Sequence, residues 1–172
     1  MAVCPILQLG NPDLLQTSSK IEFDGQLDLE QLETDLQDTM RLFRREHGWG
    51  RAIAAIQIGQ PVRAIYTDWP QARLLVNPKL TNPSGATFEM WDDCMSFPNL
   101  MVKVRRYVSF DLVWQDKQGR EFSERIEGDY SELLQHELDH LDGVLATHNA
   151  LDATSFMERS EWIRQRGQAS QN

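Results

Sequence analysis

Two histidines and a glutamate in the segment 135–140 have the residue types and the spacing of a metal-dependent hydrolase. His136 and His140 are four positions apart, so on a helix both side chains project from one face toward a single cation, with Glu137 beside it. Neutral imidazoles bind a divalent metal without neutralising it, and the carboxylate can accept a proton from metal-bound water. The pattern predicts hydrolysis. An amphipathic helix with polar surface histidines is the alternative, and the pattern alone does not exclude it.

A hydrolytic metal site of this kind needs a third protein ligand. The side chains that can supply it are His47, Cys94, Asp142, His148 and Asp152. Asp142 lies too close to the two histidines, on the same helix, to complete a tetrahedral site. Cys94 is the better candidate because it lies in a polar bend between two apolar segments, where a thiolate can be presented to a metal.

Length and composition indicate one globular domain that spans residues 1–172. The chain has 172 residues, of which 41% are hydrophobic, and it contains no internal repeat or linker. No apolar run approaches the ~20 residues of a membrane span, so we expect a cytoplasmic protein with no membrane partner. The net charge of −9 argues against a broad nucleic-acid-binding surface, and we expect no direct nucleic-acid specificity.

The first predicted helix covers residues 28–47. Its apolar residues recur at spacings of three and four, at Leu29, Leu32, Leu36, Met40 and Phe43. Asp28 and Gln31 resemble a capping box at its start, and Gly48 supplies a stop at its end.

A second predicted helix carries the histidine pair. Its apolar stripe consists of Tyr130, Leu133, Leu134, Leu138 and Leu141. We expect Asp129 and Glu132 to form a capping box at its start and Gly143 to end it. This stripe places the histidines on a helix of the core.

Several strand-like segments lie between the two helices. They cover residues 62–66, 74–77, 86–91 and 102–114, and a hairpin turn at 116–119 follows. The longest segment alternates apolar with polar residues, but Arg106 falls on its apolar side. A buried carboxylate or a ligand can neutralise this charge, or a bulge or bend can return it to solvent, and the sequence leaves both explanations open.

The segment 48–59 has glycines at both ends and small residues between them. Small residues let the backbone approach a ligand or another element closely, and Gln57 can both donate and accept hydrogen bonds. A tightly packed strand and turn beneath the first helix would have the same composition. The segment by itself therefore does not establish a binding site.

Residues 152–167 are predicted to form a C-terminal amphipathic helix, and residues 168–172 a flexible tail. Phe156, Met157 and Ile163 supply its apolar positions, and Arg159, Arg164 and Arg166 supply a basic face. Such a face can contact an acidic surface, although a solvated face is the commoner explanation.

Three segments resemble, in order, the signature motifs of the peptide deformylase family. Residues 50–57, 92–96 and 136–140 are similar to G-x-G-x-A-A-x-Q, E-G-C-x-S and H-E-x-D-H. The resemblance extends over nearly everything up to about Ala146. It implies an α+β fold of small antiparallel sheets around a central metal-binding helix.

The resemblance also implies a role for each residue of the three motifs. Cys94, His136 and His140 would bind one divalent metal, most typically ferrous iron, with zinc or nickel as stable replacements. Glu137 would act as the general base. The Gln57 amide and the Met95 backbone N–H would stabilise the oxyanion. The residues that we expect to contact the substrate are Gly50, Arg51, Ala52, Asp92, Asp93 and Leu133.

Three departures from the family motifs bear on the substrate. Ala52 stands where the family has a second glycine, and its methyl group lies where the family's backbone approaches the peptide. Asp92 keeps the charge of the usual glutamate on a shorter arm and can meet Arg105 or Arg106. Asp93 replaces a glycine, which puts a side chain, with a left-handed backbone as one option, next to the metal site.

The resemblance implies hydrolysis of the formyl group from formyl-methionyl peptides of nascent proteins. The C-terminal helix is then a candidate for weak ribosome contact. A divergent hydrolase of another N-acyl or formamide substrate, and a non-catalytic protein that binds N-termini, are the alternatives. An ordinary zinc endopeptidase is more distant, because it would normally take its third ligand downstream of the helix.

Overall fold

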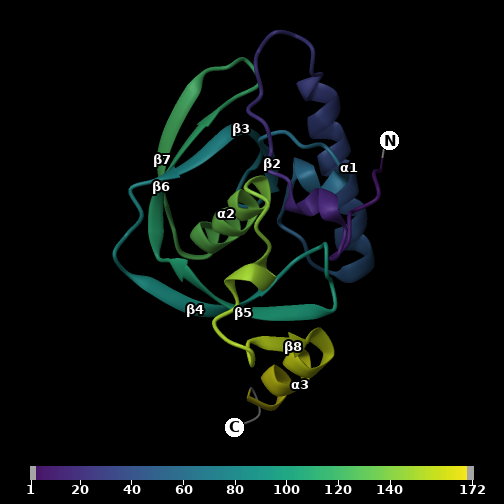
Figure 1. The fold of residues 1–172 in the computed structure, drawn as a ribbon, viewed down its shortest axis with the longest axis vertical. Coiled ribbons are helices and arrows are strands. Elements are labelled where there is room, and N and C mark those ends of the chain that lie inside the picture. The colour runs from purple at the N-terminus through teal and green to yellow at the C-terminus, as the bar shows by residue number, and fades with distance from the viewer. Residues whose placement is uncertain (1–2, 170–172) are drawn as a thin grey trace.

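The protein folds around one central helix. The structure, a computed structural model, describes residues 3–169. Its helices are α1 (Leu29–His47), α2 (Gly128–Leu141) and α3 (Arg159–Ala169), with short 3₁₀ helices at Pro12–Leu15, Ala55–Ile58 and Ala146–Asn149. Helix α2 lies in the middle of the molecule and is surrounded by strands (Figure 1).

The strands form two sheets in which neighbouring strands are antiparallel. The larger sheet contains, in spatial order, β1 (Ala52–Ala54), β2 (Ala64–Asp68), β3 (Ala72–Thr81), β6 (Ser109–Gln115) and β7 (Glu121–Glu127). The smaller sheet contains β4 (Thr87–Asp93), β5 (Leu100–Tyr107) and β8 (Phe156–Glu158). The predicted α+β fold, with small antiparallel sheets around a central helix, is confirmed.

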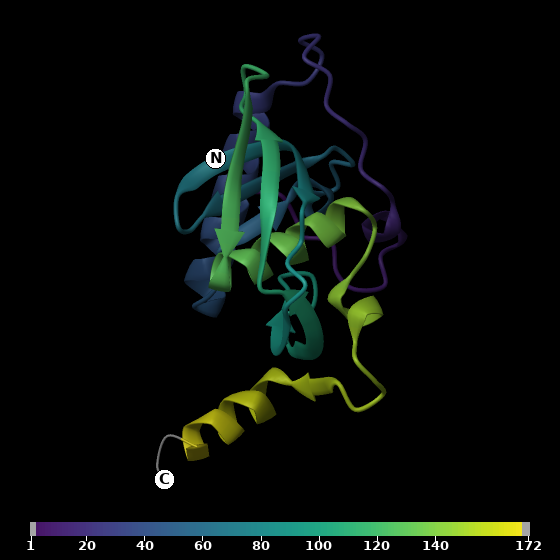
Figure 2. The same cartoon turned by 90° about the vertical axis from the view of Figure 1, so that its left-hand side faces the viewer.

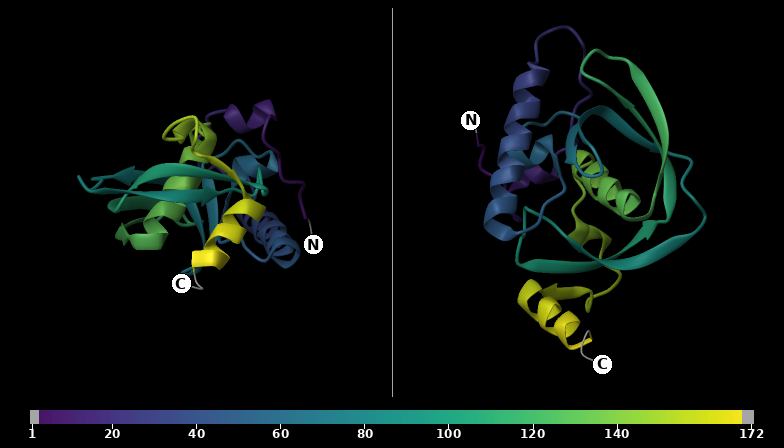
Figure 3. Two further views of the ribbon diagram at one scale, coloured as in Figure 1. Left: turned by 90° about the horizontal axis from the view of Figure 1, so that it is seen from below. Right: turned by 180° about the vertical axis from the view of Figure 1, so that it is seen from behind.

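Helix α1 covers one face of the larger sheet, on the outside of the molecule (Figure 3). It begins where the Asp28 side chain accepts a hydrogen bond from the Gln31 N–H at 3.0 Å, and it ends at Gly48, whose φ is 80°. Its buried face packs on residues of β2 such as Tyr66. The predicted helix is confirmed, and it begins at Leu29, one residue after the predicted start.

Helix α2 packs on the opposite face of the same sheet. Eleven of its 14 residues are buried, and Leu134 and Leu138 contact a core that includes Ile65 of β2. The side chains of β2 alternate between the two helices because successive residues of a strand point to opposite faces. His136 and His140 are 5% and 0% exposed, so they are not surface residues. The surface-helix interpretation of this segment is therefore wrong.

The predicted capping box of α2 is also wrong. Strand β7 leads directly into the helix at Gly128, whose φ is 61°, and the N-cap residue is Glu127, which makes no side-chain capping bond. Asp129 consequently lies inside the first turn. Glu132 is buried and forms an ion pair with Arg51 in place of a cap.

The long strand predicted over residues 102–114 is two strands in different sheets. Strand β5 pairs with β4 and β8, whereas β6 pairs with β3 and β7. The chain turns at Val108, whose N–H donates to the carbonyl of Ala86 at 3.0 Å. The alternation continues across this turn because both strands direct their apolar faces toward the core.

The C-terminal segment begins with a strand rather than a helix. Phe156 and Met157 belong to β8, which pairs with β5, and α3 starts at Arg159 and extends away from the sheets (Figure 2). Residues 168 and 169 are helical, and residues 170–172 of the predicted tail lie outside the described residues. Ile163 is 57% exposed, and α3 has no clear apolar face. Within residues 3–169, no helix is long and apolar enough to cross a bilayer.

Candidate active site

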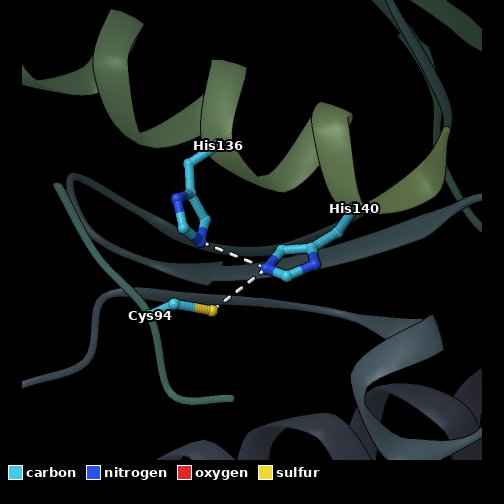
Figure 4. A group of neighbouring side chains, drawn as sticks. All are labelled: Cys94, His136 and His140. Atoms are coloured by element: carbon cyan, nitrogen blue, oxygen red, sulfur yellow. Dashed lines mark hydrogen bonds between the residues drawn. The ribbon is translucent and has the colours of Figure 1, made fainter. Parts of the chain in front are cut away.

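Three potential metal ligands converge between α2 and the end of β4 (Figure 4). The Cys94 Sγ lies 3.2 Å from His140 Nε2, and this nitrogen lies 3.1 Å from His136 Nε2. All three ligand atoms lie within 4.8 Å of one another and are buried. A thiolate with two imidazoles, all directed at one point, fits a single divalent transition metal. His47 and His148 belong to other parts of the structure and do not join this group.

A buried chain of charges fixes the orientation of His136. The Asp92 Oδ2 lies 3.0 Å from His136 Nδ1, which leaves Nε2 to face the other ligands. Arg106 donates to the same Asp92 oxygen at 2.8 Å and to Asp139 at 2.5 Å. A carboxylate behind a ligating histidine sets its tautomer and raises its basicity. The carboxylates of Asp92 and Asp139 therefore neutralise the buried Arg106, and no bend returns its side chain to solvent.

Burial and neighbouring charges shift the pKa values of the groups in the site. Burial alone would raise the pKa of Asp92, but His136 and Arg106 lower it below its usual range. Burial raises the pKa of Glu137 to about 7, which suits a group that takes up and returns a proton near neutral pH. Burial, and then the neighbouring His136, hold the pKa of His140 well below its usual value, so His140 is neutral, as a ligand must be.

Gln57 presents the N–H₂ end of its amide to the site. Its Oε1 accepts a hydrogen bond from the Ala54 N–H at 2.9 Å, so the amide nitrogen points the other way. That nitrogen lies 3.6 Å from Cys94 Sγ and 3.2 Å from Ser96 Oγ. The Ser96 N–H lies 3.4 Å from the same sulfur. Both of these N–H donors are directed at the Cys94 sulfur.

A cavity of about 410 Å³ opens beside this group. Glu137, Gln57 and Met95 line it, and so do all six residues that the sequence analysis expects to contact a substrate, namely Gly50, Arg51, Ala52, Asp92, Asp93 and Leu133. Gly50 has a φ of 125°, which favours glycine, and a Cβ there would lie 3.6 Å from the Met95 sulfur. The structure therefore brings the predicted site residues together around one space.

Sequence analysis missed several residues that line this cavity. They are Arg44, Trp49, Asp68, Trp69 and Glu132. Arg44 and Asp68 form an ion pair of 2.9 Å at the mouth, and Trp69 is 39% exposed there. The alternating pattern of the strands carries no signal for Trp69, because it lies in the turn between β2 and β3.

Comparison with known proteins places the chain in a family. A family model described as polypeptide deformylase matches residues 3–155. The chain belongs to the polypeptide deformylase family. Peptide deformylase 1 of Prochlorococcus marinus is 36% identical over 169 residues, which cover 91% of this chain and 85% of that protein. The peptide deformylase of Zymomonas mobilis is 35% identical over 157 residues, with 84% of each chain covered. The resemblance inferred from the three motifs is confirmed.

Solved peptide deformylases have the same fold. The structure from Thermotoga maritima aligns with a TM-score of 0.79 at 26% identity and covers 88% of this chain and 100% of that one. The structure from Thermus thermophilus aligns with a TM-score of 0.76 at 30% identity, with 86% and 85% covered. The chain therefore has the fold of solved peptide deformylases.

Asp93, directly before Cys94, stands where the usual deformylase motif has a glycine. Asp93 is the last residue of β4 and has extended backbone, so the left-handed conformation considered for it is wrong. Its carboxylate binds the Arg159 guanidinium at 2.7 Å. Arg159 also donates to the Pro98 carbonyl at 2.6 Å and lies 4.0 Å from the centroid of the Trp49 ring. The first residue of α3 therefore holds two cavity-lining residues, Asp93 and Trp49.

Proposed function

We propose that this protein is a metal-dependent hydrolase that removes the formyl group from formyl-methionyl N-termini of nascent proteins. The observation that carries the proposal is that Cys94 and His136 line one cavity together with Glu137 and Gln57, while His140 completes a group of three ligands with Cys94 and His136. Membership of the deformylase family supports the same reaction.

Cys94, His136 and His140 would hold one divalent metal. When bound, the metal supplies a Lewis acid that polarises the formyl carbonyl. We propose ferrous iron as the ion in the cell, with zinc or nickel as stable substitutes. A thiolate with two imidazoles suits each of these ions, and the thiolate also makes the site sensitive to oxidation.

Residues of the chain would carry out the proton transfers and stabilise developing charge. Glu137 takes a proton from the attacking water and delivers it to the amine nitrogen as the C–N bond breaks, which yields formate and a free N-terminus. The Gln57 amide N–H and the Met95 backbone N–H donate to the oxyanion that forms on the formyl carbon. Each such donor lowers the barrier by roughly 3 kcal/mol.

The cavity would receive the start of a nascent chain in the cytoplasm. Gly50, Arg51, Ala52, Asp92, Asp93 and Leu133 are the proposed substrate-binding residues. We also propose that α3 makes weak contact with the ribosome, because it projects from the body of the molecule and carries the exposed residues Arg164 and Arg166 (Figure 2). Arg159 would not take part, since its guanidinium is bound to Asp93.

A related acyl group is the second candidate substrate. Ala52 is 3% exposed and adds a methyl group to the cavity wall where the family motif has glycine. A wall that is one methyl group thicker changes which acyl groups fit. One methylene group in a pocket typically changes kcat/KM by about 10- to 200-fold. An acetyl-methionyl peptide is therefore the informative competitor.

Formate release tests the proposal directly. We expect protein purified without oxygen and loaded with ferrous iron to hydrolyse formyl-Met-Ala, and to act far more slowly on acetyl-Met-Ala. The matched control is Glu137→Gln, which keeps the shape and the metal ligands but cannot take up the proton. Formate release that survives in this control, with metal bound, would remove Glu137 from the mechanism. Faster hydrolysis of the acetyl peptide would favour the second candidate.

A further inference from the structure

The ion pair between Arg51 and Glu132 separates two cavities. The first, of about 410 Å³, contains the Cys94 end of the site. The second, of about 570 Å³, lies against α3 and includes Trp91 and Trp162 in its lining. Within residues 3–169, Arg51 and Glu132 are the two residues that line both spaces. The pair is therefore the wall between the reaction site and the second cavity.

The structure holds this wall in place from both sides. Glu132 lies on α2 four residues before His136, so the wall stands about 6 Å along the helix from a metal ligand. Its side chain is 8% exposed and accepts a hydrogen bond from the Arg51 guanidinium. Arg51 also lies 5.4 Å from the centroid of the Trp69 ring, and this ring meets Tyr130 edge-on at 5.9 Å.

In the proposed reaction, the first side chain of the substrate lies at the cavity that this wall borders. In a formylated peptide, the bond that breaks lies on the amine nitrogen of the first residue. The side chain of that residue begins two bonds from the nitrogen, so it lies beside Cys94 and Glu137 when the formyl group reacts. Leu133, the neighbour of Glu132 on α2, lines the same cavity.

We propose that the Arg51–Glu132 pair determines specificity by limiting the length of the first side chain of the substrate. The proposal rests on the proposed function. A chain longer than the pocket has to push Arg51 away from Glu132. That movement separates the buried Glu132 carboxylate from its cation, which opposes binding. A side chain that ends before the wall leaves the pair intact.

Two formylated dipeptides measure this limit. One is formyl-Met-Ala, and the other carries S-butylhomocysteine in place of methionine, which lengthens the same unbranched thioether. We expect wild-type protein to favour the methionine peptide about tenfold or more in kcat/KM, as is usual for added methylene groups in a closed pocket. In Arg51→Ala the wall opens into the second cavity, and the ratio of the two kcat/KM values should fall to about one.

Glu132→Ala opens the wall from its other side and should lower the ratio in the same way, which keeps the test available if Arg51→Ala does not fold. The double variant should show no further change, because either substitution alone breaks the pair. Arg125→Ala is the matched control. Its side chain is 41% exposed, against 39% for Arg51, it pairs with Asp111 at 2.9 Å, and it lines neither cavity. The ratio should stay at the wild-type value.

The possible results distinguish a failure of the proposed function from a failure of the specificity proposal. Failure of the wild-type protein to release formate from either peptide refutes the proposed function, and the specificity proposal with it. Formate release with the same ratio in wild type, Arg51→Ala and Glu132→Ala refutes the specificity proposal alone. Equal use of both peptides by the wild type also refutes it.

Discussion

Replacement of Arg106 by leucine should destabilise the protein severely. The Arg106 side chain is 4% exposed and is bound by Asp92 at 2.8 Å and Asp139 at 2.5 Å. The substitution leaves the Asp92 carboxylate, itself 4% exposed, without its guanidinium partner. Removal of one member of a buried ion pair lowers the free energy of unfolding by about 3–5 kcal/mol. That loss is a large part of the stability of a typical domain.

The same substitution should weaken metal binding. Arg106 anchors Asp92, and Asp92 orients His136 through Nδ1. Partners behind metal ligands typically contribute 10- to 100-fold in affinity, so we expect the dissociation constant to rise by about tenfold or more. A chelator competition assay with the folded variant measures this change separately from stability.

Urea unfolding of the metal-free proteins tests the stability prediction. Arg105→Ala is the control, because Arg105 directly precedes Arg106 in β5, is 58% exposed, and binds the half-exposed Glu89 at 2.8 Å. This substitution should lower the free energy of unfolding far less. The double variant Arg106→Leu with Asp92→Asn should lose less free energy of unfolding than the single variant, since the buried carboxylate is removed with its cation. Equal and small decreases in the free energy of unfolding for Arg106→Leu and Arg105→Ala would refute the reasoning.

Two further substitutions test other parts of the site. Gln57→Leu should lower kcat by about 10²–10³-fold with little change in metal content, because it removes one donor to the oxyanion. Metal analysis and steady-state kinetics measure both quantities. An unchanged kcat would exclude Gln57 as an oxyanion donor. Arg159→Ala should lower kcat/KM by roughly tenfold, mainly through KM, because Trp49 and Asp93 lose their anchor. Arg164→Ala, on the same helix but paired with exposed Glu161, should leave the kinetics unchanged. Similar kinetics for both arginine variants would contradict the anchoring role.

Local periodicity was sufficient to predict α1, α2 and the histidine pair, but not the start of α3. The four-residue spacing of His136 and His140 fixes their common face on any α-helix, and the leucine stripe places that face in the core. Asp28 and Gly48 marked the ends of α1 because capping is a local interaction. The three motifs then indicated which distant segments meet at the site.

Local sequence patterns did not predict the interactions between residues that are distant in the chain. Glu132 matched a capping pattern with Asp129, yet its partner is Arg51, which lies 81 residues away in the chain. The strand break at Val108 gave no signal, because the apolar alternation is the same on both sides of it. Arg159 looked like part of a solvated basic face, and its contact with Asp93 depends on how β8 positions the start of α3.

The central claim is that one metal bound by Cys94, His136 and His140 is needed for hydrolysis. X-ray absorption of the zinc-loaded protein tests it most directly, together with formate release from the same sample. We predict one sulfur ligand at about 2.3 Å with two imidazole nitrogens, and loss of both the sulfur signal and the activity in Cys94→Ser. An active wild-type sample without a sulfur ligand, or a Cys94→Ser variant with full activity, would contradict the account.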